Sequence, residues 1–286
     1  MRILIGYNGT EAAKAAMADL ALAGLPDGTE ALIMTIAEVC ARPDSPDEAR
    51  RLASEALELM RNRFPKWLIA AETANGSAGR ELLAKAETFH PDMIVVGEGR
   101  QSNRDHNMFL GQVSNLVLTE AECTVRISRE HESIIDRGPR LLIGYDGSPG
   151  AEAAVNLIAE RSWPSGTTAT LLAVADSGVV GSIGRFVPQM KDAVIETKFV
   201  SQWGHTLAAE ALATLTDAGI EASVEIVMGN AKTTIVDRAD SLNADCIFVG
   251  PHCAGNSFER FLLGSVSSTV AARAHCTVEV VRASQP

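Results

Sequence analysis

The sequence has few cysteines and no closely spaced pair of them. Five cysteines among 286 residues form no CxxC motif, and their odd number suits reduced thiols better than a disulfide framework. They are Cys40, Cys123, Cys246, Cys253 and Cys276. His252 adjoins Cys253, but zinc needs further ligands at metal spacing, and an activated thiol needs a partner placed in space. We therefore expect no protein-held metal ion and no catalytic residue.

Positive charge is also scarce. The chain carries 25 basic and 36 acidic residues, for a formal net charge of −11. Both halves share the deficit, with 14 basic and 20 acidic residues up to Glu132 and 11 and 16 after it. Nucleic-acid binding relies on a basic surface that neutralises phosphates, so we expect no nucleic-acid partner.

Long apolar runs are absent. No stretch approaches the ~18 apolar residues of a membrane-spanning helix, so we expect no membrane partner. The first ten residues, MRILIGYNGT, lead into a predicted strand without the apolar segment of a signal peptide, and a cytoplasmic protein is the expectation. A length of 286 residues with 46% hydrophobic residues suits two ordinary domains.

A long internal repeat is present instead. Residues 2–17 (RILIGYNGTEAAKAAM) align without gaps on residues 140–155 (RLLIGYDGSPGAEAAV), 138 positions later. Residues 92–129 align in the same way on residues 245–282, 153 positions later. The chain is therefore two copies of one unit, and the second copy holds 15 extra residues in its middle.

The repeat fixes the expected domain boundaries. The first domain covers residues 1–129, the second covers residues 140–286, and a polar linker at 130–139 ends in Gly-Pro. We expect the extra residues after the second strand of the second copy, around the glycine-rich and serine-rich segment 176–186. Two interpretations of that segment stay open, a flap over a ligand and a surface loop without a ligand role.

Strands alternate with helices in both copies. Short apolar runs such as residues 94–96 and 247–249 are typical of parallel strands that helices cover on both faces. Strands are expected at 2–7, 31–37, 67–72, 93–96 and 124–128, and again at 141–145, 169–175, 222–227, 246–249 and 277–281. Helices are expected at 10–24, 45–64, 77–89 and from 111, and again at 149–161, 188–218, 231–241 and 265–274. The fold class is α/β, with two doubly wound sheets.

Residues 248–268 have the sequence of a phosphate-binding turn. A short apolar strand runs into Gly250, a polar loop follows, and Gly264 and Ser265 open a helix. The free N–H groups at a helix N-terminus attract anions. In an open parallel sheet the ligand lies at the carboxyl ends of the strands, so we expect residues 144–148 and 173–175 to join residues 250–267 in one site.

These segments resemble the universal stress protein family. LLIGYDGS (141–148) resembles the family's opening strand and turn, and VGPHCAGNSFERFLLGSVSS (249–268) resembles its closing block. The resemblance covers nearly the whole chain. It implies two tandem five-stranded parallel sheets in the order 3-2-1-4-5 with helices on both faces, and dimerisation through the last strand. The two copies would then form that pairing as an internal pseudo-dimer, and a homodimer of the whole chain stays an open alternative.

Many members of the family bind ATP through G-x2-G-x9-G-[ST], with Mg²⁺ on the phosphates. By position, Asp146 matches the residue that meets the nucleoside, Val174 matches the residue beside the base, and Gly264 with Ser265 matches the closing pair. The site that the resemblance implies is Gly144, Tyr145, Asp146, Val174, Val249, Gly250, Cys253, Gly255, Gly264, Ser265, Val266 and Ser267, with ATP as the cofactor and adenine nucleotide as the partner.

The middle of the loop departs from the family pattern. Cys253 stands where the second glycine belongs, and ten residues rather than nine separate it from Gly264. Only glycine accepts left-handed backbone angles at little cost, so a cysteine here either blocks the phosphate or diverts the loop. One alternative is that Gly255 takes the role of the glycine.

The first copy departs further. Asn8 replaces Asp146, Arg100 replaces the middle glycine, and Gln112 replaces Ser265. Because a carboxylate, a glycine and a small hydroxyl are lost together, we expect a degenerate loop and a structural role for this copy.

Three classes of function are compared. The first is a stress-response or regulatory protein that binds ATP in its second copy, with at most slow hydrolysis because no catalytic base or Walker lysine is visible. The second is a scaffold that binds protein partners, with both loops degenerate. The third, a nucleotide-dependent enzyme, is disfavoured because neither first strand is followed by GxGxxG.

Overall fold

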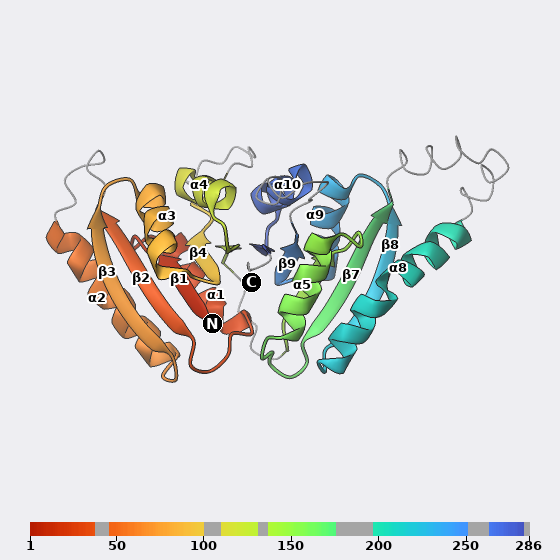
Figure 1. Ribbon diagram of the computed structural model, residues 1–286, viewed down its shortest axis with the longest axis horizontal. Helices are drawn as coiled ribbons and strands as arrows, with labels where there is room; N and C mark the ends of the chain where they lie inside the picture. The colour runs from red at the N-terminus through yellow and green to blue at the C-terminus, as the bar shows by residue number, and fades with distance from the viewer. Residues whose placement is uncertain (38–45, 100–109, 131–136, 176–196, 251–262, 283–286) are drawn as a thin grey trace. The chain divides into compact units, whose positions relative to one another are not determined.

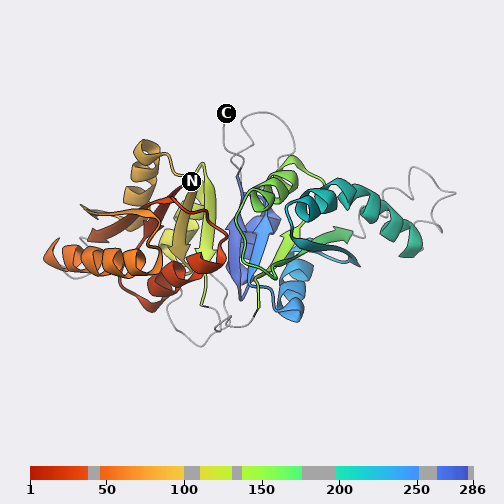
Figure 2. The same cartoon turned by 90° about the horizontal axis from the view of Figure 1, so that it is seen from below.

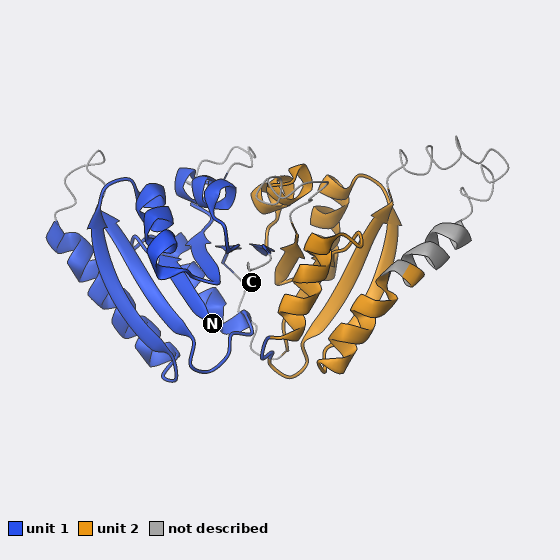
Figure 3. Ribbon diagram, in the orientation of Figure 1, with its two compact units in different colours: residues 1–133, 161–163, 277–286 blue, residues 134–160, 164–276 orange. Residues whose placement is uncertain are grey.

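The structure is a computed structural model, and it describes residues 1–37, 46–99, 110–130, 137–175, 197–250 and 263–282 (Figure 1). Of residues 197–205 and 207 it describes the backbone alone. The segment 176–186, for which a flap and a surface loop are both open, and most of the predicted linker lie outside these residues. The chain divides into two compact units (Figure 3), of which unit 1 comprises residues 1–133, 161–163 and 277–286 and unit 2 comprises residues 134–160 and 164–276.

Unit 1 is built on a sheet whose first five strands are parallel. In spatial order these strands are β3 (Leu68–Asn75), β2 (Glu30–Ala37), β1 (Arg2–Gly6), β4 (Met93–Gly97) and β5 (Thr124–Ser128). This is the predicted order 3-2-1-4-5. Since β1 has β2 on one side and β4 on the other, the strand order reverses there, and a crevice opens between the strand ends.

Burial explains which strands lie in the middle. The central strands β1 and β4 read RILIG and MIVVG, and their apolar residues are buried on both faces. The edge strand β3 reads LIAAETAN and is exposed along most of its length. Central parallel strands are covered by helices on both sides, so they need continuous apolar sequence, whereas an edge strand does not.

The helices of unit 1 cover the two faces of its sheet. Helices α1 (Glu11–Asp19) and α2 (Pro46–Arg63) pack on one face, while α3 (Ala78–Phe89) and α4 (Gln112–Glu120) pack on the other (Figure 2). A short 3₁₀ turn, η1 (Leu20–Leu22), extends α1. The predicted α/β fold class is confirmed.

Unit 2 repeats the design with four parallel strands. They lie in the order β9 (Cys246–Val249), β6 (Arg140–Gly144), β7 (Thr168–Ala175) and β8 (Glu221–Met228). Helices α5 (Pro149–Ala159) and α8 (Thr197–Asp217) pack on one face, with α9 (Ala231–Leu242) and α10 (Ser265–Arg273) on the other side. The strand order reverses at β6, as it does at β1.

The two copies share their turn chemistry as well. Thr10 caps α1 by accepting a hydrogen bond from the Ala13 N–H, and Ser148 caps α5 by accepting one from the Ala151 N–H, both over 3.3 Å. Helices α3 and α9 both end on a residue in the left-handed region, His90 at φ 48° and Asn243 at φ 47°. His90 and Asn243 are equivalent positions of the repeat, so the helix stop is part of the fold's design.

The last strand of the sequence belongs to unit 1. Strand β10 (Thr277–Val280) pairs antiparallel with β5, with Glu279 opposite Arg126. Both strands are fully buried, unlike the edge strand β3. In the part of the chain that the structure describes, no helix combines the length and the apolar character that crossing a membrane requires.

Candidate functional site

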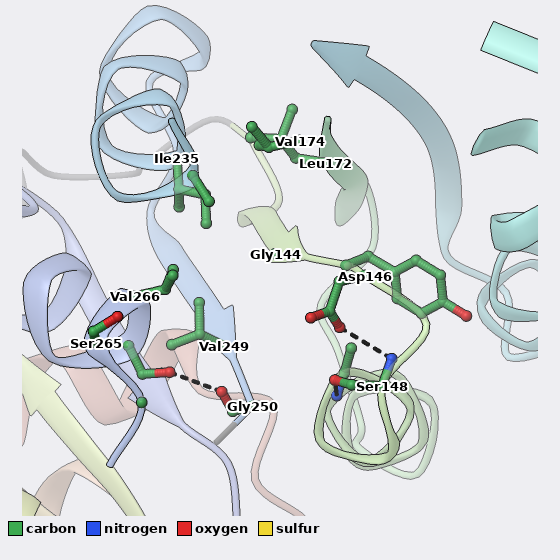
Figure 4. A pocket seen from close by; sticks show the side chains of 15 residues that line it. Gly144, Asp146, Ser148, Leu172, Val174, Ile235, Val249, Gly250, Ser265 and Val266 are labelled. Carbon is green, nitrogen blue, oxygen red and sulfur yellow. Dashed lines mark hydrogen bonds between the residues drawn. The ribbon is translucent and has the colours of Figure 1, made fainter. Parts of the chain in front are cut away.

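A cavity of about 350 Å³ lies in unit 2 at the carboxyl ends of the strands (Figure 4). Its volume falls within the range of small-molecule sites. Ten of the twelve residues predicted for the site line it: Gly144, Tyr145, Asp146, Val174, Val249, Gly250, Gly264, Ser265, Val266 and Ser267. The other two, Cys253 and Gly255, lie outside the described residues.

The position of the cavity follows from the strand order. Residues Leu141, Leu142 and Ile143 of β6 lie in register with Cys246, Ile247 and Phe248 of β9, so both strands end at one level. Their next residues, Gly144 and Val249, line the cavity. The crevice is the one that the topology predicts at a point where strand order reverses.

Asp146 is held in a fixed turn at the mouth of the cavity. One oxygen of its carboxylate accepts a hydrogen bond from the Ser148 N–H over 3.0 Å, as Figure 4 shows. Gly147 between them has φ 72°, a conformation that glycine adopts without strain. Asp146 is exposed to solvent, so its negative charge costs little desolvation.

Tyr145 lines the cavity, and its side chain anchors the turn to α5. The ring is buried, and the hydroxyl donates a hydrogen bond to the carboxylate of Glu152 in α5. Burial and the negative charge of Glu152 raise the pKa of Tyr145 well above its ordinary value. The hydroxyl is therefore protonated at neutral pH and serves as a structural donor rather than as an acid or base.

Gly250 permits a close contact between a strand end and a helix. A Cβ at this position would lie 2.2 Å from the carbonyl carbon and 2.3 Å from the carbonyl oxygen of Gly150, near the start of α5. The side chain of Ser267 donates a hydrogen bond to the Gly250 carbonyl over 2.7 Å. Ser267 and Gly250 thus position the turn, and the hydroxyl of Ser267 is bonded to the protein's own backbone.

The N-terminus of α10 forms one wall of the cavity. Gly264 is the N-cap, and no side chain among the described residues caps this helix end. Ser265, Val266 and Ser267 are its first residues, so their N–H groups have no carbonyl one turn earlier within the helix. The first turn holds no acidic residue that would compensate the positive end of the helix dipole.

An apolar wall faces the same space. Leu172 and Val174 come from β7 and Ile235 from α9, and Figure 4 shows the three side chains together at the top of the view. Val174 was predicted from the sequence, whereas Ile235, Leu172, Ala151 and Ala231 were not. Ile235 could have been inferred from its place on the apolar face of α9, since that helix follows strand β8 and packs over β6 and β7.

Unit 1 has an equivalent cavity of about 250 Å³. Asn8 makes the turn that Asp146 makes in unit 2, since its side-chain oxygen accepts hydrogen bonds from the Thr10 hydroxyl over 2.7 Å and the Thr10 N–H over 3.3 Å. Ser114 donates to the Gly97 carbonyl over 2.6 Å, as Ser267 does to Gly250. The frame of the site is therefore common to both copies.

The chemistry offered inside that frame differs. The cavity of unit 1 is lined by Asn8 and Gln112, which are neutral amides in place of the carboxylate of Asp146 and the hydroxyl of Ser265. In unit 1 the Gly111 N–H, at the start of α4, donates to the Glu98 carbonyl over 2.9 Å, and the position equivalent to Glu98 in unit 2 lies outside the described residues. Gly99 lies against Gly111, where a Cβ on Gly111 would meet the Gly99 oxygen at 2.8 Å.

Comparison with known proteins identifies the family. The model of the universal stress protein family matches the chain twice, over residues 1–129 and over residues 139–282. The chain belongs to the universal stress protein family. A universal stress protein of Mycolicibacterium smegmatis is 27% identical over 216 residues, which cover 75% of this chain and 69% of that protein. A Staphylococcus aureus protein of the same family is 31% identical over 148 residues, covering 50% of this chain and 82% of its own.

Solved structures of universal stress proteins share the fold over the full chain. The crystal structure of a universal stress protein from Archaeoglobus fulgidus superimposes with a TM-score of 0.65 at 20% identity, covering 98% of this chain and 96% of that one. A Pseudomonas aeruginosa structure reaches a TM-score of 0.62 at 16% identity, covering 98% and 92%. At such identities the likeness extends to the fold and not to the ligand.

Metal-binding side chains do not gather in the described part of this universal stress protein. No group of three or more His, Cys, Asp or Glu side chains there could hold a metal ion. The described lining of the unit 2 cavity has Asp146 as its one charged side chain and contains no lysine or arginine. Any counter-charge that this lining offers a bound anion would come from the helix dipole, from N–H groups or from a cation that accompanies the ligand.

Proposed function

We propose that unit 2 binds an adenine nucleotide, ATP with Mg²⁺, and that the protein acts as a cytoplasmic regulatory or stress-response protein rather than as an enzyme. The observation that carries the proposal is the asymmetry of the cavity. An apolar wall of Leu172, Val174 and Ile235 and a helix N-terminus without an acidic first turn line the same cavity. A flat base suits the first surface, and a phosphate suits the second.

Different residues of the cavity would contact the base, the ribose and the phosphates of the nucleotide. Val174 and Ile235 would contact the base, the carboxylate of Asp146 would accept hydrogen bonds from ribose hydroxyls, and the amides of Ser265 and Val266 would donate to phosphate oxygens. Mg²⁺ would neutralise part of the phosphate charge. Hydrolysis would be slow, since the described lining supplies neither a lysine nor an arginine to stabilise the transferring phosphoryl group.

Nucleotide release and binding measurements test the proposal. The purified full chain is denatured and the supernatant analysed by mass spectrometry for adenine nucleotides, and the stripped protein is titrated with Mg-ATP by calorimetry. We expect one site per chain, weakened by Asp146→Asn. The matched control is Asn8→Ala in unit 1, which should leave the affinity unchanged. Absence of both released nucleotide and measurable binding would refute the proposal and favour the partner-binding scaffold.

We also propose that the two copies form an internal pseudo-dimer through their last strands. The antiparallel pairing of β5 with β10 supports this arrangement, because these are the fifth strands of the first and second copies. Both strands are buried on both faces. A single chain would then contain the strand pairing through which other members of the family form dimers.

A further inference from the structure

A buried network of four charged side chains lies where β5 meets β10 in unit 1. The guanidinium of Arg126 pairs with the carboxylates of Asp19 and Glu279, with 2.7 Å between its Nε and the Asp19 Oδ2. The guanidinium of Arg161 holds both oxygens of Glu279, at 2.8 Å and 2.7 Å. All four side chains are at most 2% exposed, and their charges alternate in sign along the network.

The centre of this network is a self-facing position, by which we mean a position at which equivalent residues of the two copies lie opposite each other. Arg126 and Glu279 are equivalent residues, 153 positions apart, and they lie directly opposite each other in the antiparallel ladder. On either side the register places Ile127 opposite Val278 and Val125 opposite Val280. Of these three pairs, only the central one joins equivalent residues of the two copies, and at this position the copies differ in charge.

This geometry favours pairing of β5 with β10 over pairing of two identical last strands from different chains. If β5 paired in the same register with β5 of a second chain, Arg126 would face Arg126, and a pairing of β10 with β10 would place Glu279 against Glu279. Asp19 and Arg161 would still neutralise the overall charge in either case. The central contact would change from attraction to repulsion between fully buried groups, where like charges directly opposite are strongly disfavoured.

The flanking charges are also specific to one copy each. By the alignment of the first helices, the position of Asp19 is occupied in the second copy by Leu157, and the position of Arg161 is occupied in the first copy by Ala23. The acid therefore accompanies the strand that carries arginine, and the base accompanies the strand that carries glutamate. The network is complete and alternating only when β5 meets β10.

We propose that the Arg126–Glu279 contact selects the partner of each last strand, so that β5 takes β10 of the tandem chain and rejects a second copy of itself. The pair thereby acts as a specificity element that excludes homotypic β5–β5 and β10–β10 assembly between chains. This inference rests on the internal pseudo-dimer proposed above and is independent of nucleotide binding.

A symmetrised full-length variant, Arg126→Gln with Glu279→Gln, tests this selection. Glutamine keeps a donor for Asp19 and an acceptor for Arg161, while the self-facing position becomes identical in both copies. Wild type and variant are refolded from denaturant at rising protein concentration, and their masses are measured by light scattering after size exclusion. We expect at least about a tenfold larger fraction of double-mass species in the variant, because the repulsion against like pairing is gone.

The matched control removes another Arg–Glu pair on neighbouring strands of unit 1. Arg2 and Glu30 face each other across β1 and β2 with a 3.0 Å ion pair, but their side chains are 40% and 47% exposed. Arg2→Gln with Glu30→Gln should associate like wild type. If the symmetrised variant also associates like wild type at every concentration, the proposal is wrong, whatever the outcome of the nucleotide experiments.

A cysteine introduced at the self-facing position of β5 reports which strands have paired. In the chain Arg126→Cys with Glu279→Gln, homotypic β5 pairing places the introduced thiols of two chains opposite each other, within disulfide reach. After oxidative refolding we expect a disulfide that joins the β5 peptides of two chains. The control Val125→Cys with Arg126→Gln and Glu279→Gln places its two introduced thiols out of register and should not crosslink. Absence of the β5–β5 crosslink in the first variant would contradict the proposal.

A further variant covers the case in which the glutamine pair does not fold. Replacing the whole network with apolar residues, Asp19→Leu, Arg126→Leu, Arg161→Met and Glu279→Leu, leaves no charge from these four positions buried, and such replacements are often tolerated. The same rise in double-mass species is expected. A folded, wild-type-like mass distribution in this variant would overturn the proposal.

Discussion

The cavities of unit 1 and unit 2 share one backbone frame and differ in the side chains that this frame presents. Both have a side-chain turn after the first strand, a serine that holds a glycine carbonyl, and a glycine where strand and helix touch. Among the described residues, unit 2 has the carboxylate of Asp146 and the hydroxyl of Ser265 at positions where unit 1 has the amides of Asn8 and Gln112. Gly97 also makes a close backbone contact in unit 1, where a Cβ would lie 2.5 Å from the Ala12 oxygen, so packing by itself gives this motif glycine a role.

We expect the largest loss of stability from breaking the buried ionic network of unit 1. Arg126→Met would leave the buried carboxylates of Asp19 and Glu279 with less counter-charge, and removing one partner of a buried pair costs about 3–5 kcal/mol. Hydrogen exchange should show the loss in β1, β4 and β5 of unit 1 and leave β6 and β7 unchanged. Arg2→Met, at an exposed pair, should cost less than about 1 kcal/mol.

The next effect tests whether the first glycine of the motif is structural in both copies. Gly250→Ala and Gly97→Ala would each push a Cβ into backbone, at 2.2 Å from Gly150 and 2.5 Å from the Ala12 oxygen, and should destabilise their units by about 1–3 kcal/mol. Denaturant titration measures the loss. The Cβ of Gly144→Ala would meet two side-chain atoms at 3.2 Å, and its backbone contact would be at 3.9 Å. This substitution should therefore cost less stability. A stable Gly97→Ala protein would limit the packing role to unit 2.

A smaller effect separates the two cavities by affinity. Ser265→Ala should weaken Mg-ATP binding by about 1–2 kcal/mol if its hydroxyl meets a phosphate, while Gln112→Ala at the equivalent position of unit 1 should have no effect. Calorimetry on both variants gives the comparison. Equal affinity of Ser265→Ala and wild type would assign the phosphate contacts to backbone amides alone.

The last prediction uses acid to distinguish the units. Burial alone would raise the pKa of Glu279, but the charges of Arg161 and Arg126 outweigh it and lower the pKa below its ordinary value of 4.5. A lowered folded-state pKa stabilises the protein above pH 4.5, and that stability is lost as pH falls through the folded value. Unit 1 should therefore lose stability at acid pH, with a shallower dependence in Glu279→Gln, as monitored by hydrogen exchange. Identical pH profiles would contradict this role.

Much of the site could be predicted from the sequence because its frame depends on residues close together in the chain. The turn at Asp146, the cap at Ser148 and the helix start at Gly264 are local features with recognisable residue types. Ile235 and Leu172 escaped prediction because their side chains are ordinary core residues in sequence. They become cavity lining only when α9 and β7 pack around β6.

The sequence by itself determined the repeat, the alternation of strands and helices, and the family, because these depend on periodicity and on short motifs read along the chain. The tertiary structure decided what the individual residues do. Gly250 was predicted beside a phosphate and lies against Gly150, and Ser267 uses its hydroxyl on the Gly250 carbonyl. Arg126 and Glu279 are 153 residues apart, and only the antiparallel register makes them a pair. Contacts between distant segments depend on packing in three dimensions, so they cannot be predicted from a local sequence pattern.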